Sequence, residues 1–166
     1  LSGAASWRDI RKHTDWGVLW LFGGGLALGA IIKDSGASEA MANTMANLLG
    51  FDQDGSLSIF SLILIIGVLA IFVIMLTEFT SNTASASLLI PIFASLSTAL
   101  NLPPSLLTLV IALGGSCAFM LPVATPPNAI VFGTGYIRQI EMIRAGVWLG
   151  LFSVVMLIIF GVFIWE

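Results

Sequence analysis

Charged residues are scarce in this chain, and that scarcity excludes an ordinary water-soluble domain. Only 9% of the 166 residues are charged and 58% are hydrophobic, whereas a soluble domain carries about 25% charged residues. The charges leave long gaps, each of which reaches or exceeds the length that crosses the hydrocarbon core of a bilayer. The gaps are residues 16–32, 55–77, 79–137 and 145–165. We therefore expect an all-α integral membrane protein with several spans in the lipid bilayer.

Other absences narrow the function. The single cysteine, Cys117, excludes an intramolecular disulfide framework. No basic cluster accompanies the net charge of −3, so we expect no nucleic-acid partner. The first residues lack the basic-then-apolar order of a signal peptide, and we expect the chain to be cut from a longer protein. An intramembrane enzyme is the weaker alternative, because Ser116, Cys117, Glu78 and His13 stand in no Gly-x-Ser-x-Gly or His-Glu-x-x-His motif.

The charge pattern divides the chain into three parts. Residues 1–35 predict a polar lead-in and a spanning helix, with a glycine face that lets another helix approach closely: Gly23, Gly24, Gly25 and Gly29. Residues 36–56 predict an amphipathic linker helix at the interface, whose apolar positions are Met41, Met45, Leu48 and Leu49. The remaining apolar segments, in residues 57–166, are an interrupted pair at 57–100, a broken helix at 105–136 and a final helix at 146–165.

The first interruption lies between two apolar arms. Six of the seven residues from Thr77 to Thr83 are polar, which is far more than helix packing in lipid requires. The arms are either two full spans that meet at a surface or a re-entrant hairpin whose tip lies inside the bilayer. Glu78 is the one carboxylate here, and an ionisable residue at membrane depth indicates function by default. Simple hydration of Glu78 is the alternative.

The second interruption comes from three prolines. Pro122, Pro126 and Pro127 predict that a helix from about residue 105 to 121 breaks and restarts near Asn128. Pairs of broken apolar segments point to the binding site of a carrier. The restarting helices would aim free N–H groups at an anion. The carbonyl ends near residues 77–80 and 123–124 would suit sodium.

The basic residues predict an orientation. With alternating spans, Lys33 lies on one side of the membrane and five basic residues lie on the other: Arg8, Arg11, Lys12, Arg138 and Arg144. Because positive residues gather in the cytoplasm, we expect the C-terminus to lie outside.

The motif Ser81-Asn82-Thr83, followed by an apolar arm and then Ala124-Thr125-Pro126-Pro127-Asn128-Ala129, resembles the divalent anion/sodium symporters. The likeness covers essentially the whole chain and is strongest with the bacterial dicarboxylate transporters of that family. It implies the second, C-terminal inverted repeat of a secondary transporter, with a re-entrant helical hairpin at 57–100 and a broken transmembrane helix at 105–136. Its partner would be the N-terminal repeat of the same carrier.

The resemblance also implies activity. It predicts sodium-coupled transport of C4-dicarboxylates such as succinate across the bacterial inner membrane, with sodium as the coupling ion. The carrier would be a homodimer in which residues 57–166 form a transport part that moves against a scaffold in an elevator-type cycle. Citrate and sulfate are alternative substrates within the family, and a stand-alone membrane module or channel fragment is the alternative outside it.

The site residues are carried over by motif. The resemblance implies that Asn82 and Thr83 contact a substrate carboxylate, assisted by Thr125 and Pro126. It assigns sodium to Thr77, Ser81 and Asn82 and to carbonyl oxygens near Thr80 and Ala124. The first Ser-Asn-Thr motif of the family is absent from this chain, so these residues would form about half of a binding site.

Overall fold

The computed structural model describes Trp7, Arg11 and residues 16–49 and 58–165. Throughout these ranges the regular secondary structure is helical, so the predicted all-α class is confirmed. Two of the helices described are long and apolar enough to cross a membrane, at Ile59–Phe79 and Gln139–Ile164. The helices are α2 (Trp16–Asp34), α3 (Ala37–Leu49), α4 (Ile59–Phe79), α5 (Asn82–Ala99), α6 (Pro104–Gly114), α7 (Pro126–Gly133) and α8 (Gln139–Trp165).

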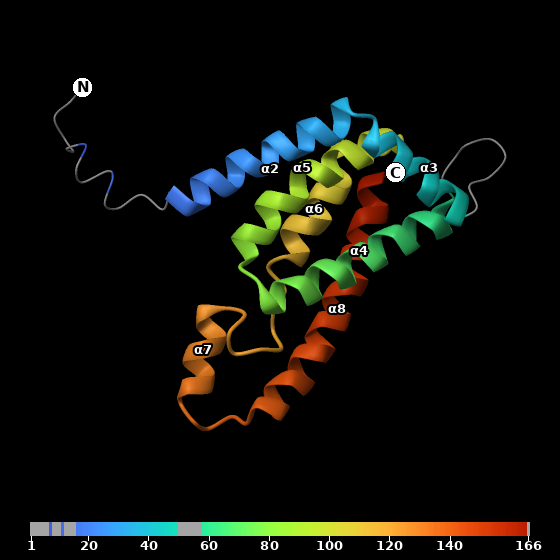
Figure 1. Cartoon of the computed structure of the whole chain (residues 1–166). Coiled ribbons are helices and arrows are strands. Elements are labelled where there is room, and N and C mark those ends of the chain that lie inside the picture. The colour runs from blue at the N-terminus through green and yellow to red at the C-terminus, as the bar shows by residue number, and fades with distance from the viewer. Residues whose placement is uncertain (1–6, 8–10, 12–15, 50–57, 166) are drawn as a thin grey trace.

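Helix α2 lies along α5 (Figure 1), and two glycines permit the close approach. A Cβ added at Gly25 would collide with the backbone carbonyl oxygen of Ser87, and one at Gly29 would lie 2.5 Å from Cβ of Pro91. Pro91 has no N–H to donate to the Ser87 carbonyl one turn earlier. The predicted glycine face is therefore confirmed at these two positions, whereas Cβ atoms at Gly23 and Gly24 would meet nothing.

Helix α3 follows α2 after a tight turn at Gly36, whose φ of 74° is in the left-handed region that glycine adopts without strain. It occupies residues 37–49 of the predicted linker. One polar pair contributes to its contact with α5, because the buried Ser95 hydroxyl donates to Ser38 Oγ at 3.0 Å. Met41 is exposed. The rest of the predicted apolar face, at Met45, Leu48 and Leu49, lies outside the described side chains.

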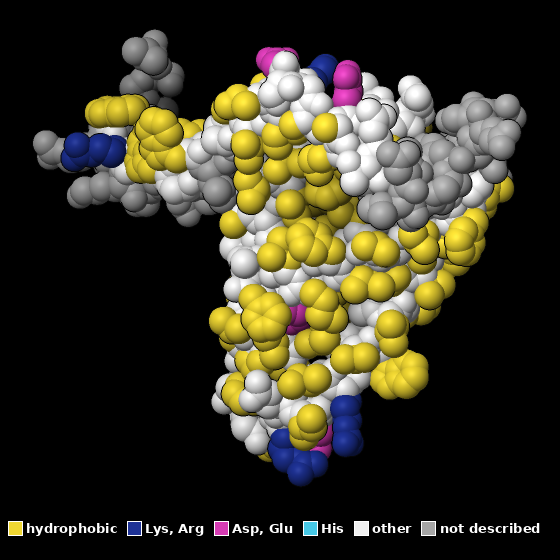
Figure 2. Space-filling model, turned by 45° about the vertical axis from the view of Figure 1, so that its right-hand side comes forward, with side chains coloured by type: hydrophobic (Ala, Val, Ile, Leu, Met, Phe, Trp, Pro, Cys, Tyr) yellow, Lys and Arg dark blue, Asp and Glu magenta, His cyan; other side chains and the backbone are white. Residues whose placement is uncertain are grey.

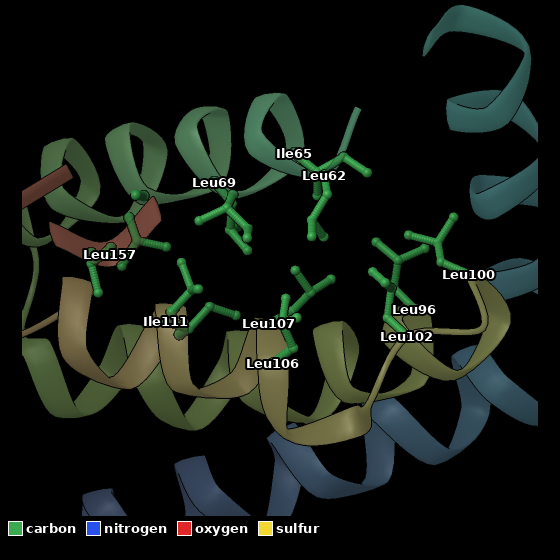
Figure 3. Close-up of a cluster of buried hydrophobic side chains, with 14 of the residues drawn as sticks. Leu62, Ile65, Leu69, Leu96, Leu100, Leu102, Leu106, Leu107, Ile111 and Leu157 are labelled. Atoms are coloured by element: carbon green, nitrogen blue, oxygen red, sulfur yellow. The ribbon is translucent and has the colours of Figure 1, made fainter. Parts of the chain in front are cut away.

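The core lies between α4, α5 and α6, with one leucine from α8 at its end. Figure 3 shows Leu62 and Leu69 of α4 facing Leu107 and Ile111 of α6, and Leu62, Leu107 and Ile111 are fully buried. Such burial of large aliphatic side chains contributes about 1.5–3 kcal/mol each when water is the alternative. This cluster packs α4 against α6 and so sets the directions of the two helices.

Two predicted boundaries are wrong. Helix α6 ends at Gly114 and not near Leu121, because Gly114 and Gly115 weaken the helix seven residues before the first proline. Helix α8 begins at Gln139 and not near residue 146, so Glu141 and Arg144 lie in its first two turns. The carboxylate of Glu141 stabilises this start, since it accepts the backbone N–H of Arg138 at 3.0 Å and binds its guanidinium at 2.8 Å.

Figure 2 shows hydrophobic side chains over the middle of the molecule and most of the charged side chains at its two ends. One end carries exposed Lys33 and Asp34 from α2, and the opposite end carries exposed Arg138 and Arg144 beside the start of α8. Large apolar side chains of α8 are exposed between these ends, among them Trp148 at 75%. This banding is the distribution that a bilayer requires.

Candidate functional site

The site begins at the junction between α4 and α5, which consists of Thr80 and Ser81. Both residues have extended backbone, with ψ of 165° and 131°, so the helical hydrogen-bond pattern stops after the Thr80 N–H has donated to the Leu76 carbonyl at 3.1 Å. No continuing helix offers N–H groups to the last carbonyls of α4. The first N–H groups of α5 start from the same point. The junction therefore presents acceptors from one helix end and donors from the next.

Two threonine hydroxyls lie on the acceptor side of the junction. Thr77 is fully buried, and its Oγ1 lies 3.0 Å from the carbonyl oxygens of both Val73 and Ile74. Thr80 donates to the Leu76 carbonyl at 2.9 Å and shares a 2.6 Å hydrogen bond with Ser85 Oγ. A hydroxyl that donates to its own helix keeps oxygen lone pairs for another partner. Both side chains can therefore offer an oxygen to a cation.

Asn82 lies at the start of α5 and is half-buried. Its Oδ1 atom is buried and has no hydrogen-bond partner among the described residues, which is costly for an acceptor unless something else satisfies it. The amide can serve two ligands, because its oxygen suits a cation and its nitrogen donates to a carboxylate. The neighbours Ser81 and Thr83 are exposed, and Ser81 Oγ accepts the Ala84 N–H at a long 3.5 Å.

The second interruption is longer than predicted and comprises residues 115–125, which we call the break loop. Helix α7 follows it, capped by Thr125, whose Oγ1 accepts the Asn128 N–H at 3.3 Å and whose carbonyl accepts the Ala129 N–H at 3.1 Å. Pro126 and Pro127 have no N–H. The predicted free N–H groups of the restarting helix are therefore wrong, because its first two residues have none and the next two donate to Thr125. The Thr125 hydroxyl is a side-chain donor at this helix start.

The structure also changes the setting of Ala124. The sequence predicted that its carbonyl closes the first arm of the broken helix, but α6 ends ten residues earlier, at Gly114. Ala124 lies instead in a turn in which its N–H donates to the Leu121 carbonyl at 3.2 Å. Its oxygen is therefore not one of a set of helix-end carbonyls.

Glu78 joins the two interruptions. Its side chain is 2% exposed, and its two carboxylate oxygens accept the backbone N–H groups of Met120 and Leu121, both at 2.8 Å. These contacts place the end of α4 against the break loop. Sequence reasoning singled out Glu78 but missed its partners, because no local pattern connects residues 42 and 43 positions apart. The Gly114-Gly115 pair was the available signal for an earlier helix end.

Asn128, near which the broken helix was predicted to restart, has its side-chain nitrogen engaged in the break loop. Nδ2 donates to the carbonyl oxygens of Ala118 and Leu121, both at 3.0 Å. Of the predicted substrate residues, Asn82 and Thr83 lie at the start of α5, whereas Thr125 and Pro126 lie at the start of α7. Glu78 connects the segments that precede these two pairs, because it lies at the end of α4 and bonds the break loop that leads to α7.

Two residues considered for catalysis, Ser116 and Cys117, each contact a backbone carbonyl oxygen of the preceding turn. Cys117 Sγ lies 3.3 Å from the Leu113 carbonyl and has no basic side chain bonded to it. The residues described contain no group of three or more His, Cys, Asp and Glu side chains that could hold a metal. His13 lies outside the described residues. A cation would therefore meet hydroxyl, amide and carbonyl oxygens, which are ligands for a hard ion.

Comparison with known proteins gives consistent matches. Residues 1–166 match the family model described as the sodium:sulfate symporter transmembrane region. The chain is 52% identical over 165 residues to an uncharacterized transporter of Haemophilus influenzae, with 99% of this chain and 34% of the relative covered. It is 47% identical over 151 residues to the sodium-dependent dicarboxylate transporter SdcS of Staphylococcus saprophyticus, with 91% of this chain and 27% of the relative covered. The chain thus spans about a third or less of these relatives.

Proposed function

The chain belongs to the sodium:sulfate symporter family, and from this membership we propose that it is the C-terminal part of a sodium-coupled carrier for C4-dicarboxylates such as succinate. One observation supports this proposal above the others. Two apolar segments are interrupted, at Thr80–Ser81 and at residues 115–125, and Glu78 holds the two interruptions together. A membrane protein tolerates such irregular backbone where it lines a polar cavity, and carriers place their substrates there.

In the proposed substrate site, one carboxylate of the dicarboxylate lies at the start of α5. The N–H groups of Asn82 and Thr83 and the positive end of the helix dipole attract an anion. The side-chain nitrogen of Asn82 and the Thr125 hydroxyl add donors, and Pro126 shapes the opposite wall. The second carboxylate would meet the N-terminal repeat.

The proposed sodium site uses neutral oxygens. Its ligands are Thr77, Thr80, Ser81, Asn82 and Ala124, the residues named by the family motif. The buried, unpartnered Oδ1 of Asn82 supports this assignment, because a cation would satisfy it. Asn82 would then touch both ions, so that binding of sodium and binding of the anion favour each other.

The wider architecture is part of the same proposal. Residues 57–100 form a re-entrant hairpin, and the transport part 57–166 moves in an elevator-type cycle against a scaffold within a homodimer in the bacterial inner membrane. The C-terminus lies outside. The opposite ends of α2 and α8 that carry Lys33 and Arg138 support this orientation, because the positive-inside rule places the more basic side in the cytoplasm.

Uptake into proteoliposomes tests the site. In the full-length carrier, Asn82→Ala and Thr83→Ala are expected to reduce sodium-driven succinate uptake at least about tenfold. The first variant loses the side-chain amide donor, and the second loses the exposed hydroxyl donor at the same helix start. Ser61→Ala is the matched control, since the Ser61 hydroxyl bonds only Ser58 Oγ at the far end of α4. Uptake at the unmodified level in both site variants contradicts the assignment.

A further inference from the structure

Glu78 is the one carboxylate that is buried within the described part of the chain, and its partners are backbone groups. Both oxygens accept N–H groups from consecutive residues of the break loop, Met120 and Leu121, at 2.8 Å. Both distances lie at the short end of the usual N–H···O range. A bidentate contact to two backbone donors fixes the orientation of the loop as well as its distance from α4.

The same stretch of loop is held from two further directions. Asn128 of α7 donates to the carbonyl oxygens of Ala118 and Leu121 at 3.0 Å, so one helix satisfies the loop's N–H groups and another satisfies its carbonyls. Helix α8 closes the third side at Gly146, where an added Cβ would lie 2.7 Å from Cα of Met120. The backbone of residues 118–121 is therefore clamped between α4, α7 and α8.

We propose that Glu78 is a positioning residue, which acts through the break loop rather than as a ligand of sodium. Its two hydrogen bonds set the place of Ala124 and Thr125 relative to the junction at Thr80 and Ser81, so that the two parts of the site are assembled before either ion arrives. This inference rests on the proposed function for its effect on transport. The loop-holding role itself is independent of what the protein carries.

The rival role for Glu78 is electrostatic, since a buried negative charge near the junction would attract sodium. Two substitutions separate the roles. Glu78→Gln removes the charge but keeps one acceptor oxygen for the loop, whereas Glu78→Ala removes the charge and both acceptors. Positioning predicts a graded loss, with the Gln variant between the unmodified protein and the Ala variant. Attraction by charge predicts that the two variants are equally impaired.

Hydrogen exchange of the full-length protein, measured without sodium or substrate, tests the clamp directly. In Glu78→Ala, the amides of Met120 and Leu121 are expected to exchange at least about tenfold faster, with a smaller increase in Glu78→Gln. Amides of α8 beyond Gly150 are expected to keep their unmodified rates. Glu141→Gln is the control, because its carboxylate caps α8 and does not contact the loop. Unchanged exchange at Met120 and Leu121 in Glu78→Ala overturns the proposal.

Transport kinetics supply the second readout. The sodium and succinate concentrations at half-maximal uptake are both expected to rise from the unmodified protein to Glu78→Gln and again to Glu78→Ala. The reason is that the proposed sodium site and the proposed substrate site both include residues placed by the loop. Equal shifts in sodium dependence for Gln and Ala, without faster exchange, establish the electrostatic role and overturn ours. If Glu78→Ala does not fold, Glu78→Gln and Asn128→Ala still test the clamp by exchange. An unmodified protein that moves no dicarboxylate contradicts the proposed function but leaves the exchange result intact.

Discussion

At the scale of single residues, the site is built from side chains whose hydrogen-bonding capacity is only partly used. Thr77 donates to its own helix and keeps lone pairs on its oxygen, while Asn82 has a buried oxygen that no described group satisfies. The family resemblance assigned both residues to the sodium site from the sequence. The sequence could not show that the side-chain nitrogen of Asn128 donates to the break loop, because these hydrogen bonds depend on the path of residues 118–121.

Thr77→Val tests the sodium site with little change of shape. The substitution removes one proposed sodium ligand, so we expect the sodium concentration for half-maximal uptake to rise about tenfold or more. Thr108→Val is a matched control, because Thr108 bonds the carbonyls three and four residues earlier in the same way but lies on α6, away from the junction. Equal sodium dependence in the two variants contradicts a role for Thr77.

At the scale of helices, the sequence predicted the positions of the interruptions better than their lengths. The junction at Thr80–Ser81 falls inside the run from Thr77 to Thr83, in which every residue except Phe79 is polar. Helix α6 ends earlier than the prolines indicate. Gly115 permits an early end, and Glu78 satisfies the N–H groups of Met120 and Leu121 that an unwound segment would leave bare. This compensation comes from a distant residue, so local pattern could not reveal it.

The close contact between α2 and α5 leads to a prediction about stability. Gly25→Ala places a methyl group against the backbone carbonyl of Ser87, and overpacking of this kind costs about 1–3 kcal/mol. Gly24→Ala faces open space and is expected to be neutral or stabilising by up to about 1 kcal/mol. Thermal unfolding in detergent measures the melting temperatures of the two variants. A lower melting temperature for Gly24→Ala than for Gly25→Ala contradicts the close contact between α2 and α5 at Gly25.

At the scale of the whole molecule, the described residues form an incomplete body. Helix α7 buries none of its side chains, and much of α8 is exposed and apolar. The chain spans only 34% and 27% of the two relatives compared here, so we expect the remainder of a full-length carrier to cover α7 and to supply the other half of the site. Lipid would cover the exposed face of α8.

The central claim is sodium-coupled dicarboxylate transport, and ion-dependent uptake measures it most directly. Proteoliposomes containing the full-length protein are loaded without sodium and given labelled succinate under an inward gradient of sodium or of potassium, with sulfate or citrate as competitors. We predict uptake above the gradient-free level only with sodium, and competition by other C4-dicarboxylates that is stronger than competition by sulfate. Equal uptake with potassium, or uptake abolished by sulfate and indifferent to dicarboxylates, contradicts the account.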